Sequence, residues 1–301
     1  MANILAIGNP VYDEIRTPFV RTPGRVLSGC STNGCLALAR LGHRATLVGA
    51  IGEDLRERFV SDMQRYGVRA YPCPSAQSGG FFLDYDERGD RTLDVLGIAD
   101  PVPHLPDIAE LPDAIIVGPV LQETPLSLIA AIHTASDAPL FLDPQGLLRR
   151  IGNTARIEHY CPDDIAALFQ LCYVVKANEI EAHILTGVEP RADPAAAAGK
   201  LRALGCTIAI VTLAEAGSFI DDGQQQVRIP AYTTLARDPT GAGDTYMAGF
   251  LHAYLERPDD LFRAGCYGAA TASIWIEHTG PDAPITLAEV ERRVVALTSF
   301  V

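Results

Sequence analysis

Hydrophobic residues along the chain form short, continuously apolar runs that alternate with segments of helical periodicity. Runs that are apolar throughout are typical of strands buried on both faces, so we expect a mostly parallel sheet with helices on either side. The predicted strands are Ile4–Ile7, Thr46–Ile51, Ile115–Val117, Leu140–Leu142, Tyr173–Lys176 and Thr207–Thr212. The predicted helices between them are Asn33–Arg40, Asp54–Tyr66, Leu126–Thr134, Asp163–Leu171, Ile180–Leu185 and Pro194–Leu204.

Glycines mark the ends of several predicted helices. Gly42, Gly67, Gly187 and Gly205 stand just past four of them, where a left-handed cap is favoured. The chain beyond Asp259 predicts further helices. We therefore expect one α/β domain over residues 1–301, with no linker, repeat or low-complexity segment.

Two segments in the first third interrupt this alternation. Residues 11–28 contain two prolines and show no helical period, and residues 80–97 predict a hairpin that turns at 87–90. We expect these two excursions to form a small β-sheet that acts as a lid over the carboxyl ends of the main strands, where open α/β sheets bind ligands. A plain surface hairpin is the alternative.

The charge and the cysteine content of the chain argue against several classes of function. The 301 residues include 24 Lys and Arg against 37 Asp and Glu, a net charge of −13, which disfavours binding to nucleic acid or to an anionic membrane. No apolar run has the length of a membrane span, and the N-terminus lacks the basic charge of a signal peptide. Seven cysteines without a CxxC pair argue against zinc and a disulfide framework. We expect a cytoplasmic protein with reduced thiols.

One stretch carries the clearest chemistry, the sequence Asp-Pro-Thr-Gly-Ala-Gly-Asp-Thr at 238–245, followed by apolar residues at helical spacing. A glycine turn that opens a helix favours anions, because free N–H groups and the helix dipole point at the ligand. Asp244, at the mouth of this turn, is well placed to act as a general base toward a hydroxyl. The alternative is that Asp244 only caps a core helix.

Seven short segments, in order along the chain, resemble the ribokinase-like, or PfkB, carbohydrate kinases. They are Gly8–Asp13, Ser28–Asn33 with Leu41-Gly42, Val48–Asp54, Gln122–Pro125, Lys176–Glu181 with Leu185–Gly187, Val211–Gly217 and Asp238–Thr245. The resemblance implies a ribokinase-like fold in which a mostly parallel central sheet flanked by helices carries a small β-sheet lid. It also implies ATP-dependent phosphorylation of a hydroxyl on a sugar, a polyol or a nucleoside.

The resemblance assigns roles on the acceptor side of the site. It implies that Asp244 is the base and that Gly241, Ala242 and Gly243 form the anion hole for the γ-phosphoryl group. The residues expected to hold substrate hydroxyls are Asp13, Gly29, Asn33 and Glu123. The carboxylates and the amide among them suit vicinal diols, because they accept or donate paired hydrogen bonds.

The resemblance also assigns residues to the nucleotide and to cations. Asn178, Thr212, Gly217, Thr240 and Gly268 are implied in binding ATP, and Asn178 with Glu181 in binding Mg²⁺ through water. The alternative for Asn178 and Glu181 is a helix-capping box. Asp238, Thr240 and Gly280 match the monovalent-cation loop of the family, which implies K⁺ in those members that use it.

Some positions depart from the family pattern. Cys30 stands where ribokinases commonly carry lysine, which argues against ribose as the substrate, and Ala214 replaces a usual glycine. The segment Asp143–Arg149 resembles members that act on inositol. Arg149 and Arg150 would either bind a phosphorylated substrate or point into solvent, and solvent is the interpretation that we favour.

The leading hypothesis is a kinase that acts on a small sugar or polyol such as myo-inositol. A nucleoside kinase of the same family, or a catalytically silent kinase-like binding protein, is the alternative. The expected partner is a small-molecule substrate, and exposed edges of the lid would allow a homodimer. The acceptor, the hydroxyl attacked and the donor stay open.

Overall fold

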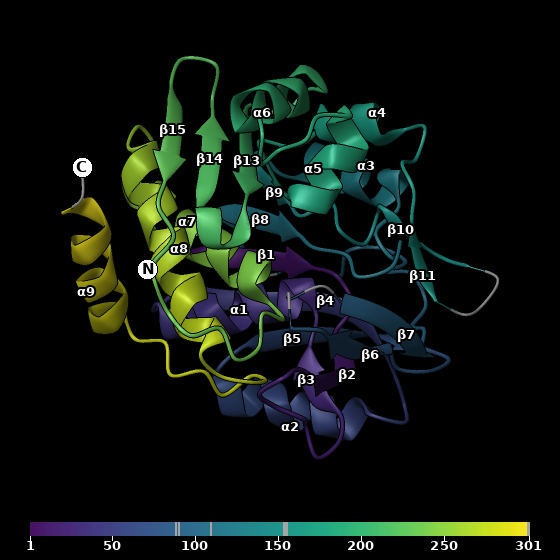
Figure 1. Ribbon diagram of the computed structural model, residues 1–301. Coiled ribbons are helices and arrows are strands. Elements are labelled where there is room, and N and C mark those ends of the chain that lie inside the picture. Colours follow the sequence, from purple (N-terminus) through teal and green to yellow (C-terminus); the bar gives the residue numbers. More distant parts are fainter. Residues whose placement is uncertain (88, 90, 109, 153–155, 300–301) are drawn as a thin grey trace.

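A nine-stranded sheet forms the centre of the computed structural model, which describes residues 1–299 except 88, 90, 109 and 153–155 (Figure 1). Its strand order is β15-β14-β13-β12-β9-β8-β1-β4-β5. Neighbours pair in parallel except at the β13–β14–β15 edge, where both pairings are antiparallel. The strands are β1 (Asn3–Ile7), β4 (Arg44–Gly52), β5 (Arg69–Ser75), β8 (Ala114–Val117), β9 (Leu140–Leu142), β12 (Val174–Asn178), β13 (Ile208–Thr212), β14 (Ser218–Asp221) and β15 (Gln226–Ile229).

The six predicted strands are confirmed as β1, β4, β8, β9, β12 and β13. Three strands were missed, namely the two edge strands β5 and β15 and the strand β14 next to β15. Strand β5 carries two prolines and is only partly buried, and β14 and β15 flank the polar stretch 221–226. The edge strands β5 and β15 need no continuous apolar run, because only part of their surface is covered, whereas β14 is mostly buried but only four residues long and polar at both ends.

Side chains of each central strand alternate between two hydrophobic cores. In β1, Ile4 and Ala6 face one core while Leu5 and Ile7 face the other. The first core packs against α1 (Cys30–Arg40), α2 (Arg56–Tyr66), α7 (Ala242–Glu256), α8 (Leu261–Ile276) and α9 (Leu287–Thr298). The second packs against α3 (Leu126–Ala135), α4 (Ile165–Phe169), α5 (Glu179–Thr186) and α6 (Pro194–Ala203).

A separate four-stranded sheet, called the small sheet below, has the order β3-β2-β6-β7. Its strands are β2 (Val11–Arg16), β3 (Val26–Ser28), β6 (Gly80–Tyr85) and β7 (Arg91–Gly97). They lie within the two segments that interrupt the α/β pattern, and β2 joins the segments by pairing in parallel with β6. Arg88 and Asp90, at the predicted hairpin turn, lie outside the described residues. A two-stranded ribbon, β10 (Arg149–Ile151) and β11 (Ile157–His159), approaches β7 through the Asp94–Arg156 bridge.

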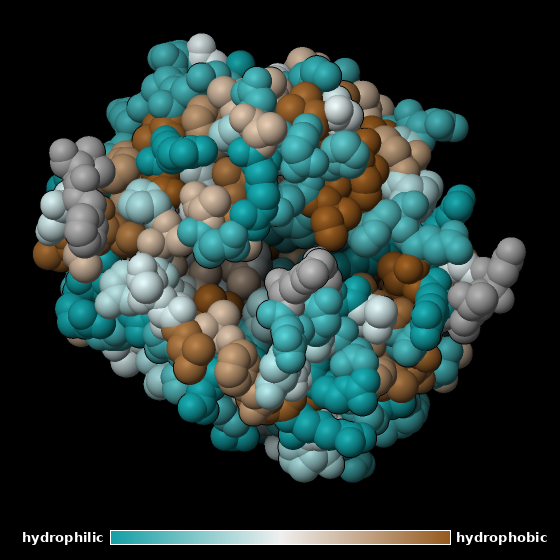
Figure 2. Space-filling model, viewed as in Figure 1, coloured by the Kyte–Doolittle hydropathy of each residue, from teal (hydrophilic) through white to brown (hydrophobic). Residues whose placement is uncertain are grey.

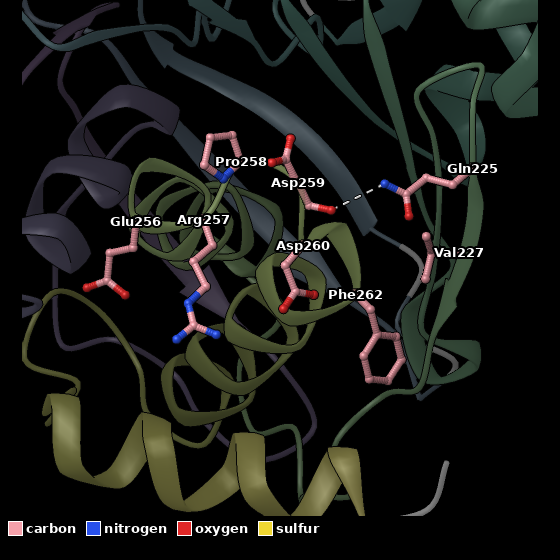
Figure 3. Close-up of a pocket in the computed structure, with 8 residues that line it drawn as sticks. All are labelled: Gln225, Val227, Glu256, Arg257, Pro258, Asp259, Asp260 and Phe262. Atoms are coloured by element: carbon pink, nitrogen blue, oxygen red, sulfur yellow. Dashed lines mark hydrogen bonds between the residues drawn. The ribbon is translucent and has the colours of Figure 1, made fainter.

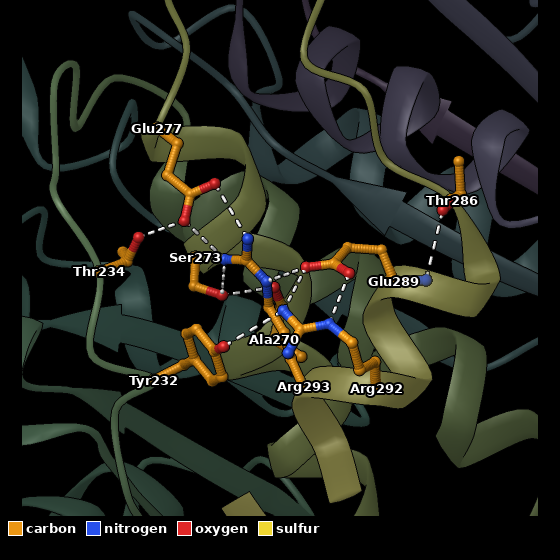
Figure 4. Close-up of polar contacts among 9 residues, drawn as sticks. All are labelled: Tyr232, Thr234, Ala270, Ser273, Glu277, Thr286, Glu289, Arg292 and Arg293. Carbon is orange, nitrogen blue, oxygen red and sulfur yellow. Dashed lines mark hydrogen bonds and ion pairs between the residues drawn. The ribbon is translucent and has the colours of Figure 1, made fainter. Parts of the chain in front are cut away.

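The last helix is fixed by a buried arginine (Figure 4). From α9, Arg293 donates to Ser273 at 3.0 Å and to both carboxylate oxygens of Glu277 at 2.9 Å, and also to Glu289 at 2.8 Å. Thr234 donates to the same Glu277 carboxylate. The network therefore ties α8 and α9 to the segment that leads from β15 into α7.

Among the described helices, none has the length and apolarity needed to cross a membrane.

Candidate active site

The residues expected to be functional gather at the carboxyl ends of the central strands. Glu123 follows β8, Asn178 ends β12 and Thr212 ends β13. Because these strands are parallel, their carboxyl ends lie at one edge of the sheet. Figure 2 shows a recess near the middle of this face, on the side of the main domain that carries the small sheet.

The N-termini of α1 and α7 meet in this region. Asn33 in α1 donates from Nδ2 to the Oδ2 of Asp244 at 2.9 Å, and both residues are buried. Gly241 is the N-cap of α7 with φ 83°, and a Cβ there would lie 2.8 Å from Nδ2 of Asn33. The cap is thus a glycine without a side-chain bond, and Asp244 sits in the first turn. The capping alternative for Asp244 is wrong.

The first turn of α7 offers free N–H groups. The Ala242 N–H donates to Pro239 O at 3.2 Å, whereas the N–H groups of Gly243 and Asp244 have no acceptor among the described residues. Unpaired N–H groups at a helix start favour an anion. The predicted anion hole is therefore available through Gly243 and Asp244, and Ala242 is already engaged.

A buried lysine lies beside this turn. A Cβ at Gly243 would lie 2.5 Å from Nζ of Lys176, which forms a 2.7 Å ion pair with Asp143. Both side chains are 3% exposed. Burial alone would lower the pKa of Lys176, but the carboxylates of Asp143 and Glu181 outweigh it and raise the pKa, so the ammonium stays charged. The turn therefore holds a permanent positive charge next to its free N–H groups.

The surroundings of Asp244 make it a stronger base than a free aspartate. Burial and the nearby Asp143 raise the pKa of Asp244, against the lowering effect of Lys176, Asn33 and Cys30. Cys30, Asp143 and Asp244 have ligand atoms within 4.8 Å of one another. One member of this trio, Asp143, is the ion-pair partner of Lys176.

Glu123 is buried but fully used by the main chain. Its Oε1 accepts from Asn9 N at 2.9 Å and Val120 N at 2.8 Å, and its Oε2 accepts from Leu121 N at 2.7 Å. Burial raises the pKa of Glu123, and these N–H groups counteract the shift. Glu123 therefore organises the loops after β1 and β8, and its predicted contact with substrate stays a prediction.

Asp13 and Gly29 link the small sheet to the site. Asp13 in β2 accepts from Phe81 N at 2.8 Å, and burial raises its pKa to about 6. Gly29 has φ 117° and lies close to Asn9 O, which a Cβ would approach to 2.9 Å. The apolar face of the small sheet packs on Cys30 and Val120. The structure thus brings Asp13 and Gly29 to the region of Asn33 and Asp244, and their predicted substrate contacts stay predictions.

Asn178 and Glu181 form a complete capping box at the start of α5. The Glu181 N–H donates to Asn178 Oδ1 at 3.0 Å, and the Asn178 N–H donates to Glu181 Oε2 at 2.8 Å. Burial raises the pKa of Glu181 to about 7. The capping alternative is present in the structure. A buried carboxylate of raised pKa also suits a cation, so the predicted role in binding Mg²⁺ through water remains compatible with the box.

Three of the predicted nucleotide residues, Thr212, Gly217 and Gly268, lie near Tyr246 of α7, whose hydroxyl is hydrogen-bonded to Ser218 at 2.7 Å. Thr212 pairs with Ser218 across β13 and β14, and Gly217 between them has φ 88°. A Cβ at Gly217 would lie 2.0 Å from Ile229 O, so only glycine fits this turn. Gly268 in α8 lies against the ring of Tyr246. Contacts of these residues with a nucleotide stay predictions.

The three residues of the predicted cation loop occupy the approach to α7 and the segment after α8. Asp238 is 1% exposed and accepts from Thr240 N at 3.0 Å, and burial raises its pKa. The Thr240 carbonyl accepts from Trp275 in α8 at 2.8 Å. Gly280 has φ 72° and lies against Val26 of the small sheet. Oxygen donors of this kind fit K⁺, which stays a prediction.

Three polar residues of the site had no assigned role in the sequence: Arg91, Asp143 and Lys176. Arg149 was expected in solvent and is only 5% exposed, which corrects that expectation, whereas the side chain of Arg150 is 58% exposed. A signal was available for Lys176, since a charged residue near the end of an apolar strand is rarely buried without a partner. The partner of Lys176 could not be predicted, because Asp143 follows β9 while Lys176 lies in β12, and no local sequence pattern shows that these two strands are neighbours.

A surface pocket of about 490 Å³ lies elsewhere, at the end of the β14–β15 hairpin remote from Gly217 (Figure 3). Gln225 bridges it by donating to Asp259 O at 3.4 Å. The lining residues are Gln225, Val227, Glu256, Arg257, Pro258, Asp259, Asp260 and Phe262. None of them is among the residues expected to be functional, so this pocket is separate from the candidate active site.

Comparison with known proteins identifies the family. A family model for the pfkB family carbohydrate kinases matches residues 116–287. The chain is 41% identical over 300 residues to a nucleoside kinase of Methanothermobacter thermautotrophicus, an alignment that covers 92% of this chain and 90% of that protein. The chain belongs to the pfkB family of carbohydrate kinases. It is also 24% identical over 278 residues to a ribokinase of Staphylococcus aureus, covering 88% of this chain and 87% of the relative.

Solved structures share the pfkB fold. A pyrophosphate-dependent kinase in the ribokinase family superposes with a TM-score of 0.81 at 20% identity, covering 96% of this chain and 99% of that one. A Burkholderia thailandensis nucleoside kinase in complex with ADP-inosine superposes with a TM-score of 0.77 at 21% identity, covering 98% and 96%. The ribokinase-like fold is thus confirmed, and as a member of this kinase family the protein is a phosphotransferase.

Proposed function

We propose that this pfkB-family protein transfers the γ-phosphoryl group of ATP to a hydroxyl of a small sugar or polyol, with Asp244 as the general base. The observation that carries the proposal is the position of Asp244. Its carboxylate is buried, oriented by Asn33, and adjacent to the unpaired N–H groups that open α7. A base and an anion site so close together are what in-line transfer to an alcohol requires.

Each residue of the site has its own role in the proposed reaction. Asp244 would take the proton of the acceptor hydroxyl, because its raised pKa makes it a better proton acceptor than a free aspartate. The N–H groups of Gly243 and Asp244, with the Lys176 ammonium beside them, would stabilise negative charge on the transferred group. MgATP, when bound, supplies the phosphoryl group and a divalent charge that offsets the charge of its phosphates.

The small sheet would serve as the lid. Its apolar face packs on Cys30 and Val120 at the edge of the site, and Tyr85 of β6 is hydrogen-bonded to Thr240 at 2.9 Å. Closure over the acceptor would exclude water, which would otherwise compete with the alcohol for the phosphoryl group. We infer that Asp13 and Asn33 orient the acceptor hydroxyls beneath it.

A nucleoside is the second candidate acceptor. It is favoured by the 41% identity to a nucleoside kinase over nearly the whole chain. An inositol is supported by the segment Asp143–Arg149 and by likeness in fold to a pyrophosphate-dependent kinase complexed with a pyrophosphate analog and myo-inositol, at a TM-score of 0.78.

A donor-consumption screen tests the proposal. We expect ADP release from MgATP to depend on an acceptor from a panel of myo-inositol, ribose, fructose, adenosine, cytidine and hexose phosphates, with and without K⁺. Pyrophosphate should be offered as a second donor. Product mass spectrometry should show an acceptor heavier by one phosphoryl group. Donor hydrolysis that no acceptor stimulates would contradict the proposal.

A further inference from the structure

The segment that leads into α7, residues 237–240 and called the approach segment below, is hydrogen-bonded to both α8 and the small sheet. On the side of α8, the Arg237 N–H donates to Ile276 O at 2.8 Å, and Trp275 donates from Nε1 to Thr240 O at 2.8 Å. The approach segment runs directly into the first turn of α7. The unpaired N–H groups of that turn therefore take their position in part from the approach segment.

The small sheet contacts the approach segment through two hydroxyl groups. Thr17, just past β2, donates from Oγ1 to Arg237 O at 2.8 Å. Tyr85, the last residue of β6, is buried, and its Oη is hydrogen-bonded to Oγ1 of Thr240 at 2.9 Å. The first contact holds the start of the approach segment. The second holds its last residue, next to the N-cap Gly241.

An arginine sets the direction of the bond between Tyr85 and Thr240. Arg91, at the start of β7, donates from Nη1 to Oη of Tyr85 at 2.8 Å. A guanidinium has no acceptor atom, so Tyr85 accepts from Arg91 and its own proton is free to be donated to Oγ1 of Thr240. The Thr240 N–H donates in turn to Asp238 Oδ1 at 3.0 Å. Thr240 is thus held at its N–H, its hydroxyl and its carbonyl.

The position of Thr240 matters because the residues after it form the predicted anion hole. N–H groups stabilise a transferring phosphoryl group only if they are fixed before the reaction, and a displacement of about 1 Å costs about 100-fold in rate. The N-cap of α7 is Gly241, which makes no side-chain bond. The contacts of Thr240 therefore contribute more to the position of the turn than they would beside a capping side chain.

We propose that Tyr85 is a positioning residue, whose hydroxyl transmits the position of the small sheet to the N–H groups of the anion hole. The proposal rests on the function proposed above. Movement of the small sheet away from the main domain would break the bond to Thr240 and release the turn. The anion hole would then be complete only with the small sheet in place, which couples enclosure of the acceptor to phosphoryl transfer.

Hydrogen exchange of the free protein tests this contact without turnover. Tyr85→Phe removes one hydroxyl and keeps the ring among the apolar side chains of the small sheet. We expect the bonded amides of Ala242 and Thr245 to exchange about tenfold faster, the effect of losing one hydrogen bond. Tyr12→Phe is the matched control, because Tyr12 joins the same sheet to Asp62 of α2 by a bond of 2.7 Å. Unchanged exchange in Tyr85→Phe, or equal acceleration in both variants, would overturn the proposal.

The fate of the donor separates positioning of the turn from simple closure of the lid. If Tyr85 acts through the turn, Tyr85→Phe should lower transfer to the acceptor and hydrolysis by water by the same factor, about tenfold. The acceptor KM should stay within twofold of wild type. If the hydroxyl only holds the lid closed, the share of donor lost to hydrolysis and the acceptor KM should both rise, and this result would overturn the proposal.

Substitution of the partner hydroxyl completes a double-mutant cycle. Thr240→Val removes the hydroxyl that Tyr85 contacts, whereas Thr240→Ser retains it and should keep most of the wild-type rate. The combination of Tyr85→Phe with Thr240→Val should be no slower than Thr240→Val alone, because both changes remove the same bond. Additive losses would contradict the proposal. A wild-type protein that uses no acceptor would refute the proposed function, while hydrogen exchange would still decide the role of Tyr85.

Discussion

Two buried carboxylates at the same edge of the sheet have opposite surroundings. Glu123 is saturated by main-chain N–H groups from Asn9, Val120 and Leu121. Asp244 accepts one strong hydrogen bond from Asn33 and otherwise faces Cys30, Asp143 and a distant amide. Burial raises the pKa of both. The difference shows that burial alone does not make a base, since a carboxylate whose oxygens are all occupied cannot accept a further proton without losing hydrogen bonds.

The largest effect should come from Asp244→Asn. The amide keeps the size of the side chain and can still accept from Asn33, but it cannot take the proton of the acceptor. We expect kcat to fall about 10³-fold, within the usual range for loss of a general base. Donor affinity should change little by calorimetry, and circular dichroism should show an intact fold. Wild-type turnover in this variant would remove Asp244 from the mechanism.

Glu181 is an intermediate case, because both of its oxygens accept from N–H groups of Asn178 and, within the described part of the chain, from no other residue. Its folded pKa of about 7 exceeds its ordinary value of 4.5. The raised pKa means that its stability contribution is complete below pH 4.5 and is lost as pH rises through 7. Relative to Glu181→Gln, the unfolding free energy of the wild-type protein should fall by about 3 kcal/mol between pH 4.5 and 8.

Chemical denaturation at several pH values checks this expectation. If Glu181 also binds Mg²⁺ through water, Mg²⁺ at pH 8 should restore part of the lost stability in the wild-type protein only. Parallel pH profiles for the two proteins would contradict the assignment of the titration to Glu181.

Glu123→Gln should act on stability more than on chemistry. One amide N–H₂ would point at main-chain donors of the 120–121 loop, and an unmade buried hydrogen bond costs about 2 kcal/mol. We expect the unfolding free energy to fall by that amount in urea, with kcat reduced far less than in Asp244→Asn. A variant of unchanged stability and abolished turnover would place Glu123 with Asp244 and break the comparison.

The smallest expected effect is a change in stability at two residues with positive φ. These are Gln122, beside Glu123, and Ala214, beside the predicted nucleotide residues Thr212 and Gly217. Gln122, at φ 59°, is held by donating to Arg149 O at 2.6 Å and to Tyr160 at 2.8 Å, whereas Ala214, at φ 48°, has no side chain that could do this. Ala214→Gly should therefore stabilise the protein by about 0.5–1 kcal/mol. Gln122→Gly, the matched control, should give no gain. Equal thermal shifts would show that backbone strain is not the cause.

Much of the main domain follows from local patterns. The apolar runs predicted six strands, and Gly67 and Gly187 end their helices at positive φ as expected. In the site, the ordered motifs predicted that Asn33 and Asp244 belong together, and the structure joins them. The Lys176–Asp143 pair and the burial of Arg149 were not predictable in this way. Both depend on which strands become neighbours, and a basic residue near a polar stretch looks solvated until the fold encloses it.

The Asn33–Asp244 bond joins residues that lie far apart in the chain, and this has a consequence for folding. Strand β1 pairs with β4 and β8, so the early part of the sheet can form while α7 and α8 are still being synthesised. Helix α1 already lies against β1 on the side of Ile4 and Ala6, whereas α7, which packs on α1, is absent until the last third of the chain has been made. A nascent chain would therefore expose the apolar side of α1 that α7 later covers, and it would stay inactive until its last third has folded, because Asp244 belongs to α7.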